Sequence, residues 1–436
     1  MSKRGSLQWF IKAVSDNLAA MAEKPSRDIG AFFLRHAINA ARATGMLPKP
    51  QAGDSILVIN LTSHFGDGVM LLPMLEAIHN ANPAVSIDIA CARGADSMFA
   101  AVPFMRNIYA VPLPSAPPLT LRAAIKRRMA IYRWYRAEHS KLHPQICLMP
   151  RWGDDLFGSV FLAYLIGAPR RVGYTSTVDR NQRTAPQRDR MLTETITGGQ
   201  GLHEPLRFLR IAQQAGLISK DQAFRTDVVS HAVQQIADSV DWQQLQQRLA
   251  LPSNAKLAVF APGASSPTRT WPVDHWITAA RMVQEAGFNV VLLSGAGDRP
   301  FAQQIQSGLP AESTHVVAGV TTLPESIALM AHADVFLGSD SGPGHAAGAL
   351  GVPTGILFVA PADVDPDHPN GPPRIGPMGP YVRGLYPTLL PPCKSACVQP
   401  YPHCITTISA ETAVNTLLDQ YRKKLAEARD TKAHGY

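Results

Sequence analysis

The chain has 436 residues, a length that suits two domains, and its hydrophobic fraction of 46% is that of a globular protein with an ample core. A formal charge of +8 and a pI of about 9.3 favour an acidic partner, such as a phosphorylated saccharide, an anionic membrane surface or a nucleic acid. The sequence has no apolar run long enough to span a membrane and no clean signal peptide. Its five cysteines indicate a reducing compartment rather than a disulfide scaffold.

Residues 1–53 form a basic extension ahead of the main fold. Apolar residues recur at helical spacing in residues 9–18 and 29–41. A basic amphipathic helix can lie on an anionic membrane surface, or it can pack on its own protein, which is the commoner outcome. Both alternatives stay open for this extension.

A buried strand is predicted at residues 55–60, and residues at helical spacing begin shortly after it, at position 69. We interpret Gly66, Asp67 and Gly68 as a turn between this strand and the helix. In an open parallel sheet, ligands bind outside the carboxyl ends of the strands. Asp67 is then either an N-cap, which stabilises a helix by about 1 kcal/mol, or a general base that faces a cleft. The flanking glycines favour the second interpretation because they let a ligand approach closely.

The first half of the chain continues as a mostly parallel α/β domain. The predicted strands are 86–91, 107–111, 145–149 and one that starts at 171, and the predicted helices are 95–100, 118–141, 156–166 and 203–215. The helix at 118–141 is strongly basic, which is typical of a solvated face but can also attract an anionic acceptor. Residues 175–201 are polar and contain several arginines, so we expect a mobile loop near a binding cleft.

The second half starts the pattern again, with a buried strand at 256–260. The loop that follows contains Gly263, Ser265 and Ser266, and Arg269 stands just before the next helix. Backbone N–H groups, two hydroxyls and a guanidinium suit a diphosphate. A serine-rich surface loop without a ligand is the alternative.

The strand predicted at 289–293 ends in the sequence SGAGD, whose last residue is Asp298. Acidic residues in this position contact a ribose in other nucleotide-binding folds. Asp298 is therefore a candidate for donor binding, followed by a short strand at 314–317 and a helix at 323–331.

Residues 335–357 read as strand, tight loop, helix and strand. Asp340 follows the first strand and is placed to hold hydroxyls. Ser341 and Gly342 turn the chain into an Ala-rich helix that starts near His345, and a helix start offers free N–H groups to an anion. Sugar plus phosphate is the ligand that this pattern suggests, whereas the alternative is an ordinary loop in which Asp and Ser cap a helix.

Residues 361–404 are rich in proline and show little periodicity, so we expect an ordered loop or a lid. Cys393, Cys397 and Cys404 lie in this stretch, with His403 beside the last. Three thiols and an imidazole are enough for a tetrahedral metal. Their spacing is not that of a standard zinc module, and adjacent residues rarely both bind one ion, so free thiols are the alternative to a structural metal.

Four segments together resemble the heptosyltransferase family of glycosyltransferases, the lipopolysaccharide-core type known as family 9. They are ILVINLTSHFGDGVMLLPML at 56–75, LHEPLRFL at 202–209, FAPGASSPTRTWPVDHW at 260–276 and VFLGSDSGPGHAAGALGVPT at 335–354. The resemblance covers residues 54–420 and implies the GT-B architecture, an α/β fold in which two Rossmann-like domains face a cleft. The implied parts are an acceptor domain at 54–240, a nucleotide-sugar donor domain at 241–408 and a helix at 409–436 that crosses back to the first domain.

The resemblance also implies roles for single residues. Asp67 corresponds to the base, Arg269 to the residue that contacts the diphosphate and Asp340 to the residue that contacts the sugar. The other donor-binding candidates are Gly263, Ser265, Ser266, Asp298, Ser341, Gly342 and His345, and the acceptor candidates are His64, Arg151 and Arg183. The sequence departs from the family at Gly344, where many members carry a larger residue, and in a longer proline-rich stretch at 361–392.

The resulting hypothesis is a bacterial, cytoplasmic, inverting glycosyltransferase with peripheral inner-membrane contact through its extension. It moves a heptose or related sugar from a nucleotide sugar, typically ADP-heptose, to an anionic glycan or glycolipid of the lipopolysaccharide core. No cofactor is required, since cationic and backbone donors stabilise the leaving group. One alternative is a relative that modifies a protein or another glycan with a different sugar, and another is a non-catalytic nucleotide-sugar-binding module. No motif supports a nucleic-acid partner.

Overall fold

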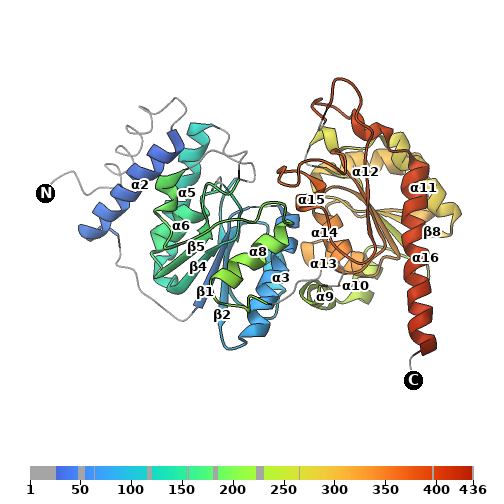
Figure 1. The fold of residues 1–436 in the computed structure, drawn as a ribbon. Coiled ribbons are helices and arrows are strands. Elements are labelled where there is room, and N and C mark those ends of the chain that lie inside the picture. The colour runs from blue at the N-terminus through green and yellow to red at the C-terminus, as the bar shows by residue number, and fades with distance from the viewer. Residues whose placement is uncertain are drawn as a thin grey trace.

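The computed structural model describes residues 26–47, 55–62, 64–114, 120–153, 155, 157–179, 185–221, 230–264, 266–394 and 397–434. Residues 9–18 of the extension lie outside these ranges, and so do Arg183 and Ser265. The described chain forms two lobes, each built on a six-stranded parallel sheet with helices packed around it (Figure 1). The predicted α/β fold with two Rossmann-like domains is confirmed.

The sheet of the first lobe has the strand order β3-β2-β1-β4-β5-β6. Its strands are β1 (Ser55–Asn60), β2 (Ser86–Ala92), β3 (Met105–Val111), β4 (Pro144–Met149), β5 (Arg170–Tyr174) and β6 (Glu194–Ile196). Every residue of β1 is buried because this strand lies between β2 and β4 with helices on both faces. The carboxyl end of β1 therefore lies at the switch point of the sheet, where successive strands are added to one side as far as β3 and to the other side from β4 onward.

The helices of the first lobe join these parallel strands. They are α2 (Ser26–Ala43), α3 (Phe65–Ala81), α4 (Asp96–Ala100), α5 (Leu121–Glu138), η2 (His139–Lys141), α6 (Ser159–Ile166), α7 (Pro186–Asp189) and α8 (Glu204–Gln214). All residues of α6 are buried, since it lies between the sheet and the outer helices of the same face.

The sheet of the second lobe has the strand order β12-β11-β10-β7-β8-β9. Its strands are β7 (Lys256–Ala261), β8 (Phe288–Leu292), β9 (Thr314–Val316), β10 (Val335–Ser339), β11 (Thr354–Leu357) and β12 (Val382–Leu385). Its helices are η3 (Pro267–Arg269), α11 (Val273–Glu285), η4 (Ala296–Asp298), α12 (Arg299–Gln306), η5 (Ala311–Ser313), α13 (Leu323–Ala331), α14 (Gly342–Ala349), α15 (Pro372–Ile375), η6 (Cys404–Thr407) and α16 (Ala410–His434).

Two helices that the sequence pattern did not indicate connect the lobes: α9 (His231–Asp238) and α10 (Trp242–Arg248). Helix α9 packs on α13 of the second lobe and also on α3 of the first. The hydrophobic core under α3 continues through α9, α13 and α14, so apolar packing joins the lobes. Residue 240, at which the sequence places the boundary between the lobes, lies between these two helices.

Helix α16 packs on the second lobe. Its main contacts are all with that lobe, which contradicts the expectation that it crosses back to the first lobe. It lies against α11, β10, β11 and β12, on the side of the second lobe that faces away from the first (Figure 1). The reason is its apolar face, where Ala413, Val414 and Leu417 are almost completely buried in the core of the second lobe.

Two segments expected to be loops contain regular structure. Residues 175–201 include α7 and β6. Asp189, the last residue of α7, accepts hydrogen bonds from Thr175 Oγ1 and the Ser176 backbone N–H, at the start of this segment. The proline-rich stretch after residue 361 includes α15 and strand β12, which pairs with β11. Both predictions overlooked short strands that form only by pairing with a neighbouring strand, β6 with β5 and β12 with β11.

The described part of the extension packs on its own protein. Leu34 and Ile38 of α2 are buried in the hydrophobic cluster that includes Phe161 of α6. Arg42 donates hydrogen bonds to the carbonyls of Tyr164 and Leu165, the second at 3.2 Å. Among the described residues, no helix is both long and apolar enough to cross a bilayer.

Candidate functional site

A cleft of about 800 Å³ lies between the lobes, a volume typical of small-molecule sites. The first lobe contributes the end of β1 and the start of α3, and the second contributes the loops after β7, β8 and β10. Each of these loops follows the carboxyl end of a parallel strand, which is where open α/β sheets bind ligands. Most predicted site residues meet here: His64, Asp67, Arg151, Gly263, Arg269, Asp298, Asp340, Ser341, Gly342 and His345 all line the cleft.

Asp67 lies in the first turn of α3 and does not belong to a turn ahead of the helix, so that part of the prediction is wrong. The N-cap position belongs to His64, which makes no side-chain capping bond. The helix begins at Phe65 and includes Gly66 and Gly68, so Asp67 lies inside the helix and does not cap it. Its side chain is 30% exposed and faces the cleft, with Oδ2 3.6 Å from His64 Nδ1.

The surroundings of Asp67 keep its carboxylate charged. Burial raises the pKa of Asp67, but a hydrogen bond with His64, the positive charge of Arg151 and a hydrogen bond with Thr62 together lower it below its usual value. The same contact raises the pKa of His64, through its hydrogen bond with Asp67. Asp67 is therefore an ionised proton acceptor at neutral pH.

Glycines let the two lobes touch at the bottom of the cleft. A Cβ on Gly66 of α3 would lie 2.8 Å from His345 Cδ2 of α14. A Cβ on Gly342, the first residue of α14, would lie 2.6 Å from Phe65 Cδ1 and 3.0 Å from the backbone nitrogen of Gly66. The starts of α3 and α14 therefore face each other at backbone distance, and α14 begins at Gly342 rather than near His345 as predicted.

Arg269 and Asp340 lie together in the second lobe. Arg269 Nη1 is 3.8 Å from Asp340 Oδ2 and donates a 3.3 Å hydrogen bond to the carbonyl of Asp340. Asp340 is only 4% exposed. Burial raises the pKa of Asp340 to about 6, and the nearby Arg269 charge only partly opposes this. The carboxylate is therefore short of partners in the free protein, which suits a group that accepts hydrogen bonds from a ligand.

Asp298 also lines the cleft from the second lobe, at the start of α12. A Cβ on Gly263 would lie 2.4 Å from Asp298 Oδ2, so a larger residue there would displace the Asp298 carboxylate. Burial raises the pKa of Asp298. Ser266 does not line the cleft, and its hydroxyl pairs with Thr268 Oγ1 at 2.8 Å.

His345 is a neutral group at the junction of the lobes. Burial lowers the pKa of His345 to about 4, and the neighbouring His203 imidazole adds to this, whereas the negative charge of Asp67 opposes it. His203 Nε2 lies 2.7 Å from the carbonyl oxygen of Gly376 in the second lobe. Burial also lowers the pKa of His203, so both imidazoles are uncharged at neutral pH.

A set of side chains that the sequence prediction missed fastens the lobes beside the cleft. We call Trp152, Glu204, Arg207, Asp367 and Arg374 the interlobe latch. Glu204 and Arg207 come from α8, and Arg374 from α15, on the face of the second lobe that looks toward the first (Figure 1). The motif LHEPLRFL marked Glu204 and Arg207 as part of a resemblance, but no pattern in the sequence pairs them with residues 160 or more positions away.

The latch consists of charge-assisted hydrogen bonds across the lobes. Arg207 Nη2 donates to Asp367 Oδ1 at 2.6 Å, and Arg374 Nε donates to Glu204 Oε2 at 3.0 Å. The Arg207 and Arg374 guanidinium carbons lie 3.9 and 5.1 Å from the ring centre of Trp152. Arg207 is fully buried and Arg374 is 5% exposed, so solvent screens these pairs little. Because Arg374 also lines the cleft, the proline-rich segment both borders the site and holds the lobes together.

The departure at Gly344 has a steric cause. A Cβ there would meet the side chains of Ile356 in β11 and Pro377 in the proline-rich segment. A larger residue there would displace the Ile356 side chain, whose Cδ1 would lie 2.5 Å from the added Cβ.

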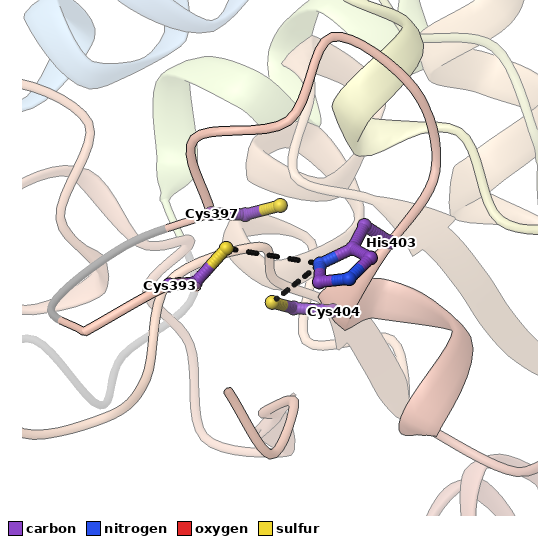
Figure 2. A group of neighbouring side chains, drawn as sticks. All are labelled: Cys393, Cys397, His403 and Cys404. Atoms are coloured by element: carbon purple, nitrogen blue, oxygen red, sulfur yellow. Dashed lines mark hydrogen bonds between the residues drawn. The ribbon is translucent and has the colours of Figure 1, made fainter. Parts of the chain in front are cut away.

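The three cysteines and the histidine of the proline-rich stretch come together away from the cleft. Their ligand atoms all lie within 4.8 Å of one another (Figure 2). His403 and Cys404 are adjacent in the sequence, and both side chains nevertheless face the same point.

Two Rossmann-like domains that face a shared cleft define the GT-B class of proteins. The profile of glycosyltransferase family 9 (heptosyltransferase) matches residues 154–363 of this chain. The resemblance to this family that the motifs predicted is confirmed.

The chain is similar to known heptosyltransferases. It is 28% identical to lipooligosaccharide heptosyltransferase 2 of Haemophilus ducreyi over 175 residues, which are 39% of this chain and 49% of that protein. The chain thus spans about half the length of this curated relative. The structure of E. coli ADP-heptose lps heptosyltransferase II matches with a TM-score of 0.61 and 18% identity, over 85% of this chain and 99% of that one. E. coli heptosyltransferase WaaC with ADP matches with a TM-score of 0.61 and 17% identity, over 84% and 99%. These structures confirm the GT-B fold.

Proposed function

We propose that the protein is an inverting glycosyltransferase that moves a heptose or related sugar from a nucleotide sugar to a hydroxyl of a lipopolysaccharide-core glycan. The observation that carries the proposal is that Asp67, Arg269 and Asp340 line one cleft between the lobes. ADP-heptose is the proposed donor. In its support, the similar E. coli WaaC was solved with ADP.

Asp67 is the proposed general base. Its lowered pKa keeps it ionised, and it lies at the start of α3 in the first lobe, the lobe that we propose binds the acceptor. The acceptor hydroxyl gives its proton to Asp67 while its oxygen attacks the anomeric carbon. The bond from that carbon to the diphosphate oxygen breaks on the opposite face, so the configuration inverts. His64 stabilises the carboxylate before the transfer.

Arg269 is the proposed partner of the diphosphate that leaves. Negative charge develops on the leaving oxygen, and a guanidinium with nearby backbone N–H groups stabilises it without reorganisation. Asp340 is the proposed acceptor of hydrogen bonds from the sugar, and Asp298 of those from the ribose. No metal takes part in this scheme, because Arg269 and the start of α14 supply the positive potential.

The acceptor side is proposed from Arg151 and His64. Arg151 lines the cleft, and its guanidinium lies 4.8 Å from the ring centre of Phe157, a contact that holds it in place. A cation beside the base suits an anionic, phosphorylated glycan.

Peripheral membrane contact through the extension remains a proposal. Phe32 and Phe33 on α2 are 36% and 38% exposed, whereas Arg35 and Arg42 of the same helix bond to their own lobe. Sedimentation with vesicles that contain anionic lipid should carry the full chain down, and less of a Phe32→Ser, Phe33→Ser variant. Equal sedimentation of both would remove α2 from the contact.

The function is tested by incubating the protein with ADP-heptose and a truncated, heptose-acceptor lipopolysaccharide core. We expect release of ADP and a product with inverted anomeric configuration by NMR. A non-catalytic binding module would shift its melting temperature with ADP-heptose but release no ADP. A relative with another specificity would bind a different nucleotide sugar in a panel of such donors.

A further inference from the structure

A closed group of metal-binding side chains lies in the second lobe, between β12 and α16. Its members are Cys393, Cys397, His403 and Cys404, and Figure 2 shows all four side chains pointing toward one another. None of them lines the cleft between the lobes. Sugar transfer as proposed above makes no use of them.

We propose that these four side chains bind one structural Zn²⁺ ion in a tetrahedral Cys₃His site. Zinc binds sulfur at about 2.3 Å and imidazole nitrogen at about 2.0–2.1 Å, so a tetrahedral site separates S and N by about 3.6 Å. His403 Nδ1 lies 3.7 Å from Cys393 Sγ and 3.4 Å from Cys404 Sγ. These separations match the edges of a zinc tetrahedron, and the remaining pairs, all within 4.8 Å, need only small side-chain movements.

The backbone around the cluster is arranged for thiolates. The Leu390 N–H points at Cys404 Sγ at 3.4 Å, and the Val398 N–H points at Cys393 Sγ at 3.5 Å. Such hydrogen bonds favour the charged form of sulfur and accompany metal-bound cysteines as a second shell of contacts. Cys404 is fully buried and Cys393 is 8% exposed, so an unpaired thiolate in either position would be unfavourable without a cation.

The ligand set indicates a structural rather than a catalytic ion. Four protein ligands close the coordination sphere and leave no position for water or substrate. Three soft thiolates and one imidazole select zinc over magnesium or calcium, which prefer oxygen. A disulfide is the competing arrangement, but it would join two sulfurs, leave the third cysteine over and give His403 no role; all five cysteines are free thiols in the structure.

The position of the cluster explains what an ion would do. It would join the loop at Cys393 to Cys404, the first residue of η6, which leads directly into α16. Ile405 and Ile408 follow in the core of the second lobe, and Trp271 Nε1 donates a 2.9 Å hydrogen bond to the carbonyl of Ile408. Zinc would therefore fasten the loop at Cys393 to the core of the second lobe at the start of η6.

The test is elemental analysis of the purified full chain by mass spectrometry. We expect about one zinc per chain, as a closed four-ligand site requires. Cys397→Ser and His403→Ala should lose most of this zinc and melt at a lower temperature. Cys147→Ala removes a buried cysteine of β4 in the first lobe and should keep the full zinc content.

A second measurement keeps the proposal falsifiable if the variants do not fold. A thiol-blocking mercurial added to the wild-type chain should release zinc in step with the modification of cysteines, as a chromogenic chelator reports. The proposal of a metal site would be overturned if the purified protein contains no metal and the reduced chain also takes up no added Zn²⁺. One equivalent of iron would overturn the assignment of zinc. Loss of zinc with unchanged sugar transfer would leave the proposed function standing, so the two proposals fail separately.

Discussion

At the scale of single residues, the cleft contains two carboxylates in opposite electrostatic states. Asp67 is held ionised by His64 and Arg151, whereas burial raises the pKa of Asp340 to about 6 against the opposing charge of Arg269. The first is suited to accept a proton, and the second is suited to receive hydrogen bonds from a ligand. Different surroundings thus give two aspartates different roles.

Asp340 predicts the pH dependence of donor use. As the pH falls through about 6, Asp340 becomes protonated and loses its capacity to accept hydrogen bonds from the sugar, so kcat/KM for the donor should fall. Asp67 stays ionised in this range because its pKa is lowered. In Asp340→Asn the activity should be lower at all pH values, and the limb near pH 6 should disappear from the profile. A limb that persists unchanged in this variant would assign the titration to another group.

Asp340 also predicts a gain of stability. A buried carboxyl whose folded pKa is raised binds more protons folded than unfolded between about pH 4 and 6, so its ionisation destabilises the fold above that window. Asp340→Asn should therefore raise the free energy of unfolding at pH 7 by about 1–3 kcal/mol, a gain that shrinks as the pH approaches 4. Asp363→Asn, at an exposed position, is the matched control and should change nothing. A pH-independent effect of Asp340→Asn would contradict this account.

At the scale of elements, the site is the meeting of two helix starts. Helices α3 and α14 approach through Gly66 and Gly342, and each brings a polar group from its own lobe. A Cβ on Gly342 would lie 2.9 Å from the Phe65 Cβ and 3.0 Å from the Gly66 backbone nitrogen, so a side chain added there would push the two helix starts apart. The separation of base and donor site is therefore set by the two glycines.

Gly342→Ala should weaken ADP binding by about 10-fold or more, which is about 1.4 kcal/mol, because its Cβ would meet Phe65 and the backbone of Gly66. Calorimetric titration with ADP measures this. Gly297→Ala, whose Cβ would meet nothing within 4 Å, is the control with the same chemical change in the same lobe. Equal affinity of the Gly342 variant and the wild type would show that the lobes do not need this close contact.

The interlobe latch should contribute strongly to stability. Arg374→Met removes one of the two guanidinium partners of buried Glu204, while Arg207 Nη1 stays at 3.1 Å. The loss should therefore exceed that of an exposed pair but stay below the about 3–5 kcal/mol of a buried charge left without any partner. Urea unfolding measures the loss. Arg422→Met breaks an exposed pair with Asp419 on α16 and should cost at most about 1 kcal/mol. If both variants lose the same small amount, the latch does not hold the lobes together.

At the scale of the whole molecule, the sequence predicted what depends on local pattern and missed what depends on distant partners. Apolar runs such as residues 256–260 predicted the central strands, and the strand–loop–helix pattern around Asp340 predicted β10 and α14, whose junction lines the cleft. The latch could not be predicted, because Arg207 and Asp367 are 160 positions apart and the motif that contains Arg207 does not indicate its partner. Strand β12 was missed for the same reason, since only its pairing with β11 makes it a strand.

The placement of α16 and of Asp67 shows the limits of inference from a family. The resemblance put the last helix across both lobes, but its apolar face matches the second core alone. The resemblance implied that Asp67 is the base, but it did not predict that this residue lies in the first turn of α3, which only the structure shows. Motifs therefore predicted which residues meet, and packing determined how they meet.

The most direct test of the central claim compares Asp67→Asn with the wild type in sugar transfer and in ADP binding. The account predicts that the variant binds ADP as the wild type does but transfers sugar on the order of 100-fold more slowly, as for loss of a general base. Arg269→Ala should instead weaken ADP binding, since Arg269 lines the cleft from the second lobe and is the proposed partner of the diphosphate. Transfer at the wild-type rate by Asp67→Asn would contradict the claim that this carboxylate, facing the donor lobe across the cleft, takes the proton.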